Sequence, residues 1–463
     1  MMKYFNVISF AFLIIIIGCN KNWDDYYSVK NNNLKYNILE TIKENPELSK
    51  FYDFLTKTGY DQILQSSKNY YVWAPKNDAF NNFDTSGLKS VIGFYISFSP
   101  TIETGKKCRI KMINGKYTEI DTNSIESSKI LSVTVCKNGI LHIIDKAYTP
   151  KPNIWEYFQT KTDNFLQKKF IDKLFTEIFD KENSKPIGID QNTGLTIYDT
   201  IRLWKNIYLT NVANLENESE LFTYIILSDN AFQTGVDTFK RYFKPLNDSL
   251  NIIKDSLAAY NVCNELAIIG KYKPSELPSY FSTTNGNIIR FNASDIDSFV
   301  ETSNGIIYFL NSLPIKENDK FKSIIIEGEN LEKASSKEWI IRKVNEASGS
   351  FDILFDNTSA AKWIQYSVYI PYPAKYQFYC TSVFKSDSTT SQNIGLFTFN
   401  PSETTSAFYK FPSFKSTKDY SSEIYLGEYT FTSEMNISLR ISNVSATKQP
   451  PVTLDYIRII PVK

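Results

Sequence analysis

One short segment occurs twice in this chain and constrains its architecture more than any other feature. Residues 138–145 read Asn-Gly followed by an alternating apolar run that closes at a proline, and residues 304–311 repeat this pattern. Asn-Gly supplies the positive-φ turn that starts a strand, and a later proline cannot donate to a ladder, so it ends one. Each copy also follows a related turn segment, residues 73–80 and 226–232. We therefore predict two related domains.

Length and charge limit the possible functions. A chain of 463 residues has room for about three domains of roughly 150 residues each. Its 42% hydrophobic and 22% charged residues are typical of globular protein. Lys and Arg number 51 against 50 Asp and Glu, so the chain lacks the basic excess of a nucleic-acid binder. We expect no nucleic-acid partner.

The N-terminus has the pattern of an export signal. Residues 7–17 form an unbroken apolar run, which fits a signal peptide and is shorter than the roughly 20 residues of a spanning helix. The run ends at Gly18-Cys19, which resembles a bacterial lipobox and implies lipidation of Cys19 and attachment to a membrane. The alternative is an ordinary cleaved signal with an incidental cysteine. We assign residues 1–19 to a lipoprotein signal peptide and the polar residues 20–33 to a tether.

Residues 34–150 combine helical and strand patterns. Apolar residues recur at three- and four-residue spacing from Leu34 to Leu55, and alternating segments follow. Segments 73–80 and 138–150 resemble the two conserved blocks of the fasciclin domain. The resemblance implies an α/β fold with a small β-wedge, acting in adhesion or as a scaffold. The motif residues, for which we predict structural roles, are Pro75, Asn77, Asp78, Asn138, Gly139 and His142.

Residues 151–315 resemble a second, divergent fasciclin domain. They keep the Asp-Asn-Ala-Phe of residues 229–232 and Asn304-Gly305. Ser228 stands where the first copy has its proline, and Tyr308 stands where it has its histidine.

Local chemistry suggests what three of the motif residues do. His142 alternates with Ile140 and Ile144 on an apolar strand face, which favours a buried, hydrogen-bonded imidazole over a ligand or a catalytic base. Asn77 and Asp78 are typical turn and N-cap residues, so we expect their side chains to accept N–H groups of the next helix.

Two cysteines leave an alternative open. Cys108 and Cys136 lie on strands that we expect to be neighbours. An exported protein can form a disulfide there, and two buried thiols are the other possibility.

Residues 321–463 change to short alternating segments broken by Ser, Thr, Asn and Pro, the pattern of a β-sandwich. Residues 363–371 and 376–379 predict a hairpin around Pro373-Ala374.

The last region resembles calcium-containing jelly-roll carbohydrate-binding modules, a galactose-binding-like fold. Glu327, Glu329 and Asp455 match the carboxylates of that family. Such carboxylates repel one another unless a hard cation such as Ca²⁺ lies between them, whereas solvated carboxylates without a metal are the alternative. Sugars pack on aromatic faces, so Trp339 and Tyr409, near expected loops, are candidate sugar-binding residues; plain packing is the alternative reading.

Motifs for catalysis are missing. The chain has one histidine, which excludes sites and triads built on several. It contains no His-Glu-x-x-His, Cys-x-x-Cys, phosphate loop or Gly-x-Ser-x-Gly elbow, and nothing points to a particular pair of glycosidase carboxylates. We predict that it is not an enzyme.

The predicted fold class is multidomain, with two α/β fasciclin-like domains followed by an all-β jelly-roll sandwich. Trp23 to Tyr27 in the tether resemble the start of mature fasciclin-domain lipoproteins of the Bacteroidota, which implies an outer-membrane lipoprotein displayed on the cell surface. We expect the sandwich to bind an extracellular polysaccharide or oligosaccharide, with the fasciclin-like pair as spacer and outer-membrane glycan-uptake proteins as neighbours. The alternative is an adhesion or scaffold protein whose fasciclin-like domains contact a protein partner.

Overall fold

The computed structural model describes residues 35–66, 68–81, 83–98, 107–180, 183–244, 251–355, 362–385, 391–402, 404–444 and 451–463. The chain divides into two compact units, one ending at Lys151 and one beginning at Pro152. Cys19 and the segments predicted to be a signal peptide and a tether lie outside the described residues. Among the residues that the structure describes, no helix has both the length and the apolar character needed to cross a bilayer.

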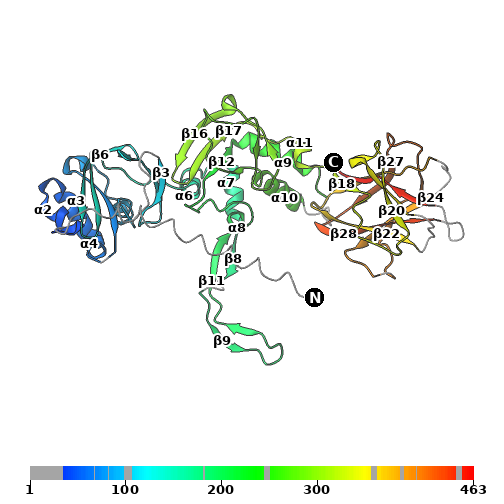
Figure 1. Ribbon diagram of the computed structural model, residues 1–463, viewed down its shortest axis with the longest axis horizontal. Helices are drawn as coiled ribbons and strands as arrows, with labels where there is room; N and C mark the ends of the chain where they lie inside the picture. Colours follow the sequence, from blue (N-terminus) through cyan, green and yellow to red (C-terminus); the bar gives the residue numbers. More distant parts are fainter. Residues whose placement is uncertain are drawn as a thin grey trace, which may run out of the picture. The chain divides into compact units, whose positions relative to one another are not determined.

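The first unit is a seven-stranded sheet with short helices packed against it (Figure 1). The strands follow the spatial order β2-β1-β7-β6-β5-β4-β3, and only β1 and β7 pair in parallel. The strands are β1 (Tyr70–Pro75), β2 (Ile96–Phe98), β3 (Cys108–Lys111), β4 (Tyr117–Ile120), β5 (Ser124–Ile125), β6 (Ser128–Cys136) and β7 (Gly139–Ile144). The helices are α2 (Ile38–Glu44), η1 (Pro46–Leu48), α3 (Ser49–Thr58), α4 (Tyr60–Leu64), η2 (Asn77–Phe80) and α5 (Leu88–Gly93).

The Asn-Gly pair ties β7 to the elements around it. The Asn138 side chain accepts the Ile38 N–H at the start of α2 (2.8 Å) and donates to the Leu64 carbonyl (2.6 Å). Gly139 has φ +137°, and a Cβ there would lie 1.8 Å from the Tyr70 carbonyl oxygen. Only glycine lets β7 approach β1 this closely.

The second copy reproduces these contacts, which supports the inferred duplication. The Asn304 side chain accepts the Ile154 N–H (2.8 Å) and donates to the Leu215 carbonyl (2.8 Å). A Cβ on Gly305 would lie 1.9 Å from the Phe222 carbonyl oxygen. The strand that Gly305 begins again pairs in parallel with the strand that Phe222 begins.

This second α/β domain has a four-stranded sheet of order β13-β12-β17-β16. Its strands are β12 (Phe222–Leu227), β13 (Ala267–Ile269), β16 (Ile296–Thr302) and β17 (Gly305–Leu310), and the short β14 (Phe281–Ser282) pairs with β15 (Ile288–Ile289). Its helices are α6 (Ile154–Lys161), α7 (Leu166–Ile171), η3 (Asp172–Leu174), α8 (Ile207–Asn211), α9 (Asp229–Lys240), α10 (Asn251–Cys263), η4 (Ala293–Asp295) and α11 (Glu317–Lys320).

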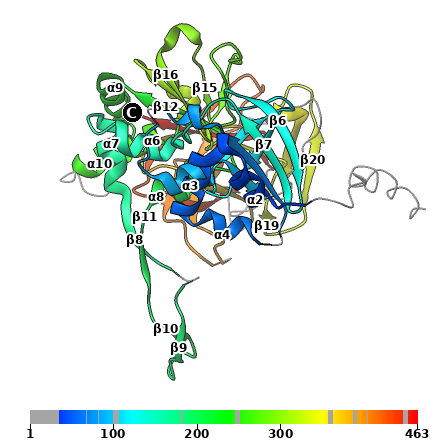
Figure 2. The same ribbon diagram turned by 90° about the vertical axis from the view of Figure 1, so that its left-hand side faces the viewer.

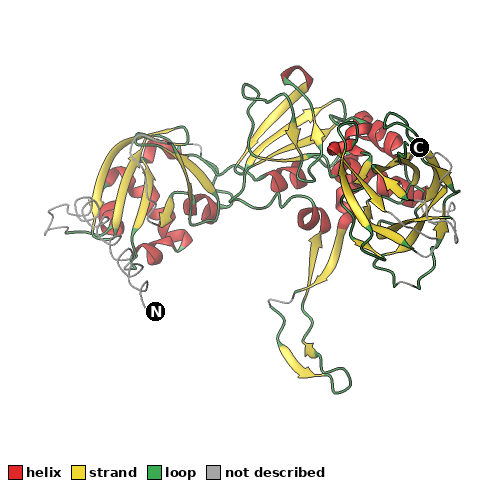
Figure 3. Cartoon of the chain, turned by 45° about the vertical axis from the view of Figure 1, so that its right-hand side comes forward, coloured by secondary structure: helices red, strands yellow, loops and turns green. Residues whose placement is uncertain are grey.

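A long β-ribbon leaves this domain between η3 and α8 (Figure 2). It consists of two successive two-stranded sheets, β8 (Phe175–Phe179) with β11 (Arg202–Asn206), and β9 (Pro186–Ile189) with β10 (Thr196–Tyr198). The ribbon extends away from the four-stranded sheet in all three overall views (Figure 3).

The last region folds as a β-sandwich, as predicted. One sheet has the order β18-β30-β23-β27, the second has the order β19-β22-β28-β24-β25 with β26 also on β24, and a small third sheet has the order β20-β21-β29. Aliphatic and aromatic side chains from the first two sheets fill the space between them.

The strands are β18 (Ile324–Glu327), β19 (Lys333–Ala334), β20 (Trp339–Lys343), β21 (Phe351–Phe355), β22 (Trp363–Ile370), β23 (Lys375–Thr381), β24 (Ser391–Thr398), β25 (Tyr409–Lys410), β26 (Phe414–Lys415), β27 (Ile424–Thr430), β28 (Met435–Asn443), β29 (Val452–Leu454) and β30 (Tyr456–Val462), with one short helix, η5 (Ser348–Ser350).

The hairpin predicted around Pro373-Ala374 is wrong. β22 pairs with β28 and β19, whereas β23 pairs with β30 and β27, so the chain crosses from one sheet to the other at this turn. The turn contacts the preceding domain, where the Lys244 N–H donates to the Pro373 carbonyl (2.7 Å). A crossing strand pair and a hairpin share the same local sequence pattern, because both need only two alternating segments and a turn.

Buried contacts join the second α/β domain to the sandwich. The Phe321 ring stacks on Tyr242 (3.9 Å between centroids) and packs edge-on against Tyr372 (5.2 Å). Beside it the buried Lys320 ammonium pairs with the buried Glu265 carboxylate (2.7 Å). These contacts help to hold the second α/β domain and the sandwich together in the compact unit that begins at Pro152.

Candidate functional site

Two of the predicted carboxylates, Glu327 and Asp455, lie near each other where β18 and β30 pair. Gly328 donates its N–H to the Asp455 carbonyl (2.6 Å), and a Cβ on Gly328 would lie 2.2 Å from the neighbouring Leu454 carbonyl oxygen. Ser348, in η5, donates its N–H to Asp455 Oδ1 and its hydroxyl to Glu327 Oε1, each at 2.9 Å. The close approach at Gly328 thus brings carboxylates from both ends of the sandwich sequence to one serine.

This cluster is electrostatically unbalanced. Burial first, and then the neighbouring charges of Glu327, Asp352 and Glu329, together raise the pKa of Asp455 to about 7 against the opposing Ser348 hydrogen bond. The pKa of Glu329 is also raised, first by burial. Two buried oxygens, Glu327 Oε2 and Glu329 Oε2, have no hydrogen-bond partner. Buried oxygens of this kind are costly unless a cation or a proton satisfies them.

The donor chemistry suits a hard cation. All the donors are oxygens, as Ca²⁺ prefers, although Ca²⁺ takes six to eight ligands and would need backbone carbonyls or waters besides these carboxylates. Across the described parts of the chain, no group of three or more His, Cys, Asp or Glu side chains is already arranged as a metal site. Calcium binding would therefore require these carboxylates to draw closer together, and the calcium site stays a prediction.

The two predicted sugar-binding residues lie apart in the fold. Trp339 begins β20 of the small third sheet, opposite Phe355, and is partly buried against the core. Tyr409 lies in β25 of the second sheet, edge-on to Phe411 (5.0 Å). The structure does not bring them into one site, and a sugar-binding role for either stays a prediction.

An arginine and two tyrosines form a row across the outer face of the first sheet. Arg458 of β30 is opposite Tyr379 of β23, which is opposite Tyr425 of β27. The Arg458 guanidinium lies 4.9 Å from the Tyr379 ring centroid, and the two tyrosine rings are 5.3 Å apart. Tyr425 is 52% exposed. We call this row, together with Glu423 and Tyr456, the tyrosine face.

Hydrogen bonds hold the polar groups of the tyrosine face in place. Glu423 accepts from the Tyr456 hydroxyl (2.8 Å), from Arg458 Nε (2.7 Å) and from Arg458 Nη2. These bonds, chiefly the Arg458 bond, lower the pKa of Glu423, so it is a carboxylate at neutral pH. At the other side of the row the Tyr379 hydroxyl donates to Gln377 Oε1 (3.0 Å).

Strand alternation could have revealed the tyrosine face. Tyr379 alternates with the buried Phe378 and Cys380, and Arg458 alternates with the buried Ile457 and Ile459. This period-two pattern places polar and aromatic side chains together on one outer face. Alternation places each of these residues on an outer face, but it does not show that strands about 80 residues apart are paired, so the sequence did not predict that they form one site.

Unlike the tyrosine face, part of the outer face of the second sheet is covered by other residues of the chain. The Arg440 guanidinium lies 3.9 Å from the Trp363 ring centroid and 4.7 Å from that of Phe397. Arg440 Nη2 also donates to the carbonyls of Pro401 and Ser402 (3.0 and 3.1 Å). The segment at 401–402 thus covers this part of the sheet.

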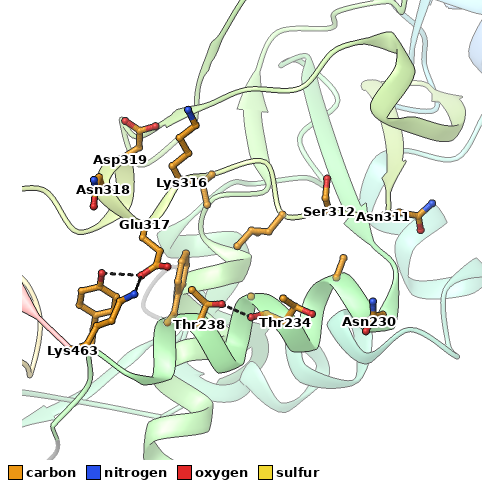
Figure 4. Close-up of a pocket in the computed structure, with 16 residues that line it drawn as sticks. Asn230, Thr234, Thr238, Asn311, Ser312, Lys316, Glu317, Asn318, Asp319 and Lys463 are labelled. Atoms are coloured by element: carbon orange, nitrogen blue, oxygen red, sulfur yellow. Dashed lines mark hydrogen bonds and ion pairs between the residues drawn. The ribbon is translucent and has the colours of Figure 1, made fainter.

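A groove of about 890 Å³ runs along α9 in the second α/β domain (Figure 4). Asn230, Thr234 and Thr238 recur at four-residue spacing along it, as on one face of a helix. At one end Glu317 accepts from the Tyr242 hydroxyl (2.9 Å) and pairs with the Lys463 ammonium (2.7 Å). Its volume is that of a small-molecule site, and its rim is polar. Its residues come from segments far apart in the sequence, and no local pattern predicts that they line one groove.

The histidine of the first repeated segment is buried, as predicted, but incompletely hydrogen-bonded. The His142 ring stacks on Trp73 (5.2 Å between centroids, 9° between planes), and its Nδ1 has no hydrogen-bond partner. Burial lowers the pKa of His142 to about 4, against a backbone hydrogen bond at Val72 that raises it. It is therefore neutral at physiological pH and is not poised as a general base.

The capping roles predicted for Asn77 and Asp78 are wrong. The helix that follows, η2, has Lys76 at its N-cap without a capping side chain. Asn77 Oδ1 instead accepts the Lys50 N–H at the start of α3 (2.9 Å). Its counterpart Asp229 accepts the Leu166 N–H at the start of α7 (2.7 Å). Asn77 and Asp229 therefore each accept an N–H group at the start of a helix distant in sequence. The local sequence pattern does not reveal such a partner.

Strand register also corrects one equivalence between the copies. Pro75 lies opposite Ile144, and Leu227 lies opposite Leu310. Leu227, not Ser228, therefore occupies the proline position, whereas Tyr308 does occupy the position of His142.

No disulfide joins the described cysteines, Cys108, Cys136, Cys263 and Cys380. Cys108 and Cys136 are not on neighbouring strands, because β4 and β5 lie between β3 and β6. Of the two alternatives, the structure therefore has thiols.

No protein-family model and no curated protein matches the chain. Among solved structures it is similar to a family 35 carbohydrate-binding module from Clostridium thermocellum, with 15% identity and a TM-score of 0.24, over 30% of this chain and 98% of that one. It is similar to the C-terminal CBM6 of LamC, a marine laminarinase from Zobellia galactanivorans, with 12% identity and a TM-score of 0.23, over 30% and 99% of the chains. It is also similar to a FAS1 domain pair from the insect cell adhesion molecule Fasciclin I, with 16% identity and a TM-score of 0.22, over 60% and 99%. Identities and TM-scores are low, so the fold assignment rests on the strand order and register given above.

Proposed function

We propose that this chain is a non-catalytic glycan-binding protein that captures an extracellular polysaccharide or oligosaccharide on the tyrosine face of its sandwich. The observation that carries the proposal is the row of Arg458, Tyr379 and Tyr425 across neighbouring strands, with fixed polar groups beside it. The C–H face of a pyranose packs on such rings, while hydroxyls need donors and acceptors at set positions.

The residues around the row supply both kinds of polar group. Glu423 offers carboxylate oxygens as acceptors, Arg458 offers N–H donors, and Gln377 offers an amide. Glu423 and Arg458 already bond to each other, and Gln377 already bonds to Tyr379 and Glu428. Because hydrogen bonds hold these side chains in place, little side-chain freedom is lost when a sugar arrives. One such site is weak, and many copies on one surface would strengthen capture by avidity.

A calcium ion would support this site rather than perform chemistry. Glu327, Glu329 and Asp455 would hold it, and its charge would neutralise the carboxylates that join the first and last strands of the sandwich. Catalysis finds no support in the chain's one histidine, which is buried with a pKa of about 4.

Cellular placement is part of the proposal and rests on the sequence. Lipidation of Cys19 would anchor the chain in the outer membrane, facing outward, with the two α/β domains as spacer and glycan-uptake proteins nearby. Palmitate labelling tests this: the wild-type chain should incorporate label and Cys19→Ala should not.

The test of glycan capture is an array screen of residues 20–463 with calcium, repeated with chelator. Tyr425→Ala should weaken any binding at least tenfold without disturbing the fold, since its ring is half exposed. Tyr369→Ala is the matched control, because Tyr369 is 50% exposed on the outer face of the other sheet. Silence across the array, or equal binding by both variants, would reject the proposal.

One observation favours the alternative, adhesion through the first domain. Leu131, Val133 and Val135 alternate along β6 and are 50%, 56% and 42% exposed, an apolar stripe that a protein partner could cover. If Val133→Lys lowers cell–cell attachment while glycan binding is absent, adhesion becomes the better account.

A further inference from the structure

The β-ribbon of the second α/β domain is an addition to the repeated fold. In the first domain α3 and α4 are separated by Gly59 alone, which turns with φ +78°. In the second domain the corresponding helices α7 and α8 are separated by η3 and all four ribbon strands. Since the first domain completes the fold without it, the ribbon is not needed to build the domain core.

The ribbon exposes far more apolar surface than a free β-hairpin normally does. Ile187, Ile189, Leu195 and Trp204 are each about two-thirds exposed, and Phe179 and Ile197 are 44% exposed. In the ladder Ile189 is opposite Thr196 and Ile197 is opposite Gly188, so apolar side chains lie on both faces. Patches of this kind mark interaction sites, and a two-stranded ribbon alone is marginal in water.

The chemistry of the ribbon points to a polypeptide as its occupant. Each of its sheets is only two strands wide, so both edges present backbone N–H and C=O groups, which a lipid interior cannot satisfy. The exposed side chains of its outer part are chiefly aliphatic, and the Tyr198 ring packs edge-on against Phe179 (5.6 Å) rather than presenting an open face to a sugar. Between 175 and 206 its described residues carry four carboxylates and three cations, so charge selects neither a basic nor an acidic partner.

We propose that the ribbon is a self-association site, at which the ribbons of two copies of this chain pair edge to edge. The ribbon has two unpaired strand edges and apolar side chains on both faces, so the same surface of a second copy can pair with it. A twofold axis between the two copies would limit the assembly to a dimer. The pairing would turn each two-stranded sheet into part of a four-stranded one, which is wide enough to be stable. About 30 residues are available from each copy, the number that a standard interface takes from one side.

Balanced charge also permits this pairing. The ion pair between Arg202 and Glu177 (2.8 Å) lies within the ribbon, so two ribbons would not meet as like-charged surfaces.

The experiment measures mass against concentration by sedimentation velocity for residues 20–463, from about 1 to 100 µM. We expect the mass to double with rising concentration. The double variant Ile187→Lys, Ile189→Lys should need at least a hundredfold more protein for the same shift. Ile269→Lys is the matched control, since Ile269 is as exposed as Ile189 but lies on β13 of the main sheet. It should behave as the wild type.

Hydrogen exchange gives a second readout that misfolding of the variant does not mimic. In the wild type the amides of β9 and β10 should be protected at high concentration and exchange at low concentration. A chain that stays monomeric throughout, or a dimer that the double lysine variant leaves intact, overturns the proposal. Protection of the ribbon only when a different protein is bound would also overturn the proposal.

Discussion

Protonation of His142 should destabilise the first unit, because its pKa of about 4 lies well below the ordinary 6.5. A histidine whose pKa is lower in the folded than in the unfolded state contributes stability that is full above pH 6.5. That stability is lost as the pH falls through 6.5 toward 4. The physical cause is burial, and charged Nδ1 would carry a proton with no acceptor in reach.

The magnitude follows from the shift. A difference of 2.5 between 6.5 and 4 corresponds to about 3 kcal/mol at 1.36 kcal/mol per unit. The side chain is only 8% exposed, so solvent screens little of this. A loss of about 3 kcal/mol is a large fraction of the 5–15 kcal/mol that a domain typically has.

The chain contains a single histidine, which makes the assay specific. The His142 Cε1–H NMR signal reports its own titration, and its native and unfolded peaks report urea unfolding of the first unit at pH 7, 5.5 and 4.5. We expect a pKa near 4 and a urea midpoint that falls steadily below pH 6.5. His142→Phe keeps a ring on Trp73 and should lose the part of the acid sensitivity that comes from this site. A measured pKa of 6 or above would refute the argument from burial.

Three further predictions concern other parts of the chain. The raised pKa of Asp455 means that the folded sandwich loses stability as the pH rises toward 7 and this carboxyl ionises. Asp455→Asn should therefore raise the metal-free stability of the sandwich at pH 7.5 by about 2 kcal/mol. It should also abolish any thermal shift on adding calcium, because a proposed ligand is removed. A wild-type melting temperature equal with calcium and with chelator would count against the cation. Gly139→Ala should cost at least about 3 kcal/mol in urea unfolding, since its Cβ would meet the neighbouring strand, whereas Gly188→Ala, with open space around it, should cost under about 1 kcal/mol. Glu265→Gln should cost about 3–5 kcal/mol by leaving the buried Lys320 unpaired, measured as a lower unfolding temperature of the second unit; a neutral result would mean that Lys320 gives up its proton.

The duplication could be predicted because it depends on backbone constraints that are visible locally. Gly139 and Gly305 each admit a neighbouring carbonyl where any side chain would collide. Such a constraint leaves the same Asn-Gly mark in both copies. By contrast, Asn77 acts on Lys50, 27 residues away, and no local rule assigns that partner.

The sandwich shows the same division between local and distant information. Alternation identified its strands, since one face of each is buried. Alternation does not show which strand pairs with which, so the local pattern predicts a hairpin at Pro373 where the chain in fact crosses between sheets. For the same reason Tyr379, Tyr425 and Arg458, which come from three separate strands, were missed, while Trp339 and Tyr409 were chosen for their position near loops.

The two copies of the α/β domain also show where new function can be added. The two side-chain hydrogen bonds of Asn138 (2.8 and 2.6 Å) match those of Asn304 (2.8 and 2.8 Å) in partner type and length, so this part of the sheet core tolerates little change. The helix-to-helix turn at Gly59 carries no such constraint, and at this position the second copy gained its ribbon. An insertion that leaves the core intact yet exposes Ile187 and Ile189 is hard to explain by folding alone, because exposed apolar side chains do not stabilise the domain. Its apolar surface is better explained by a contact made after folding, which is the contact that the sedimentation experiment tests.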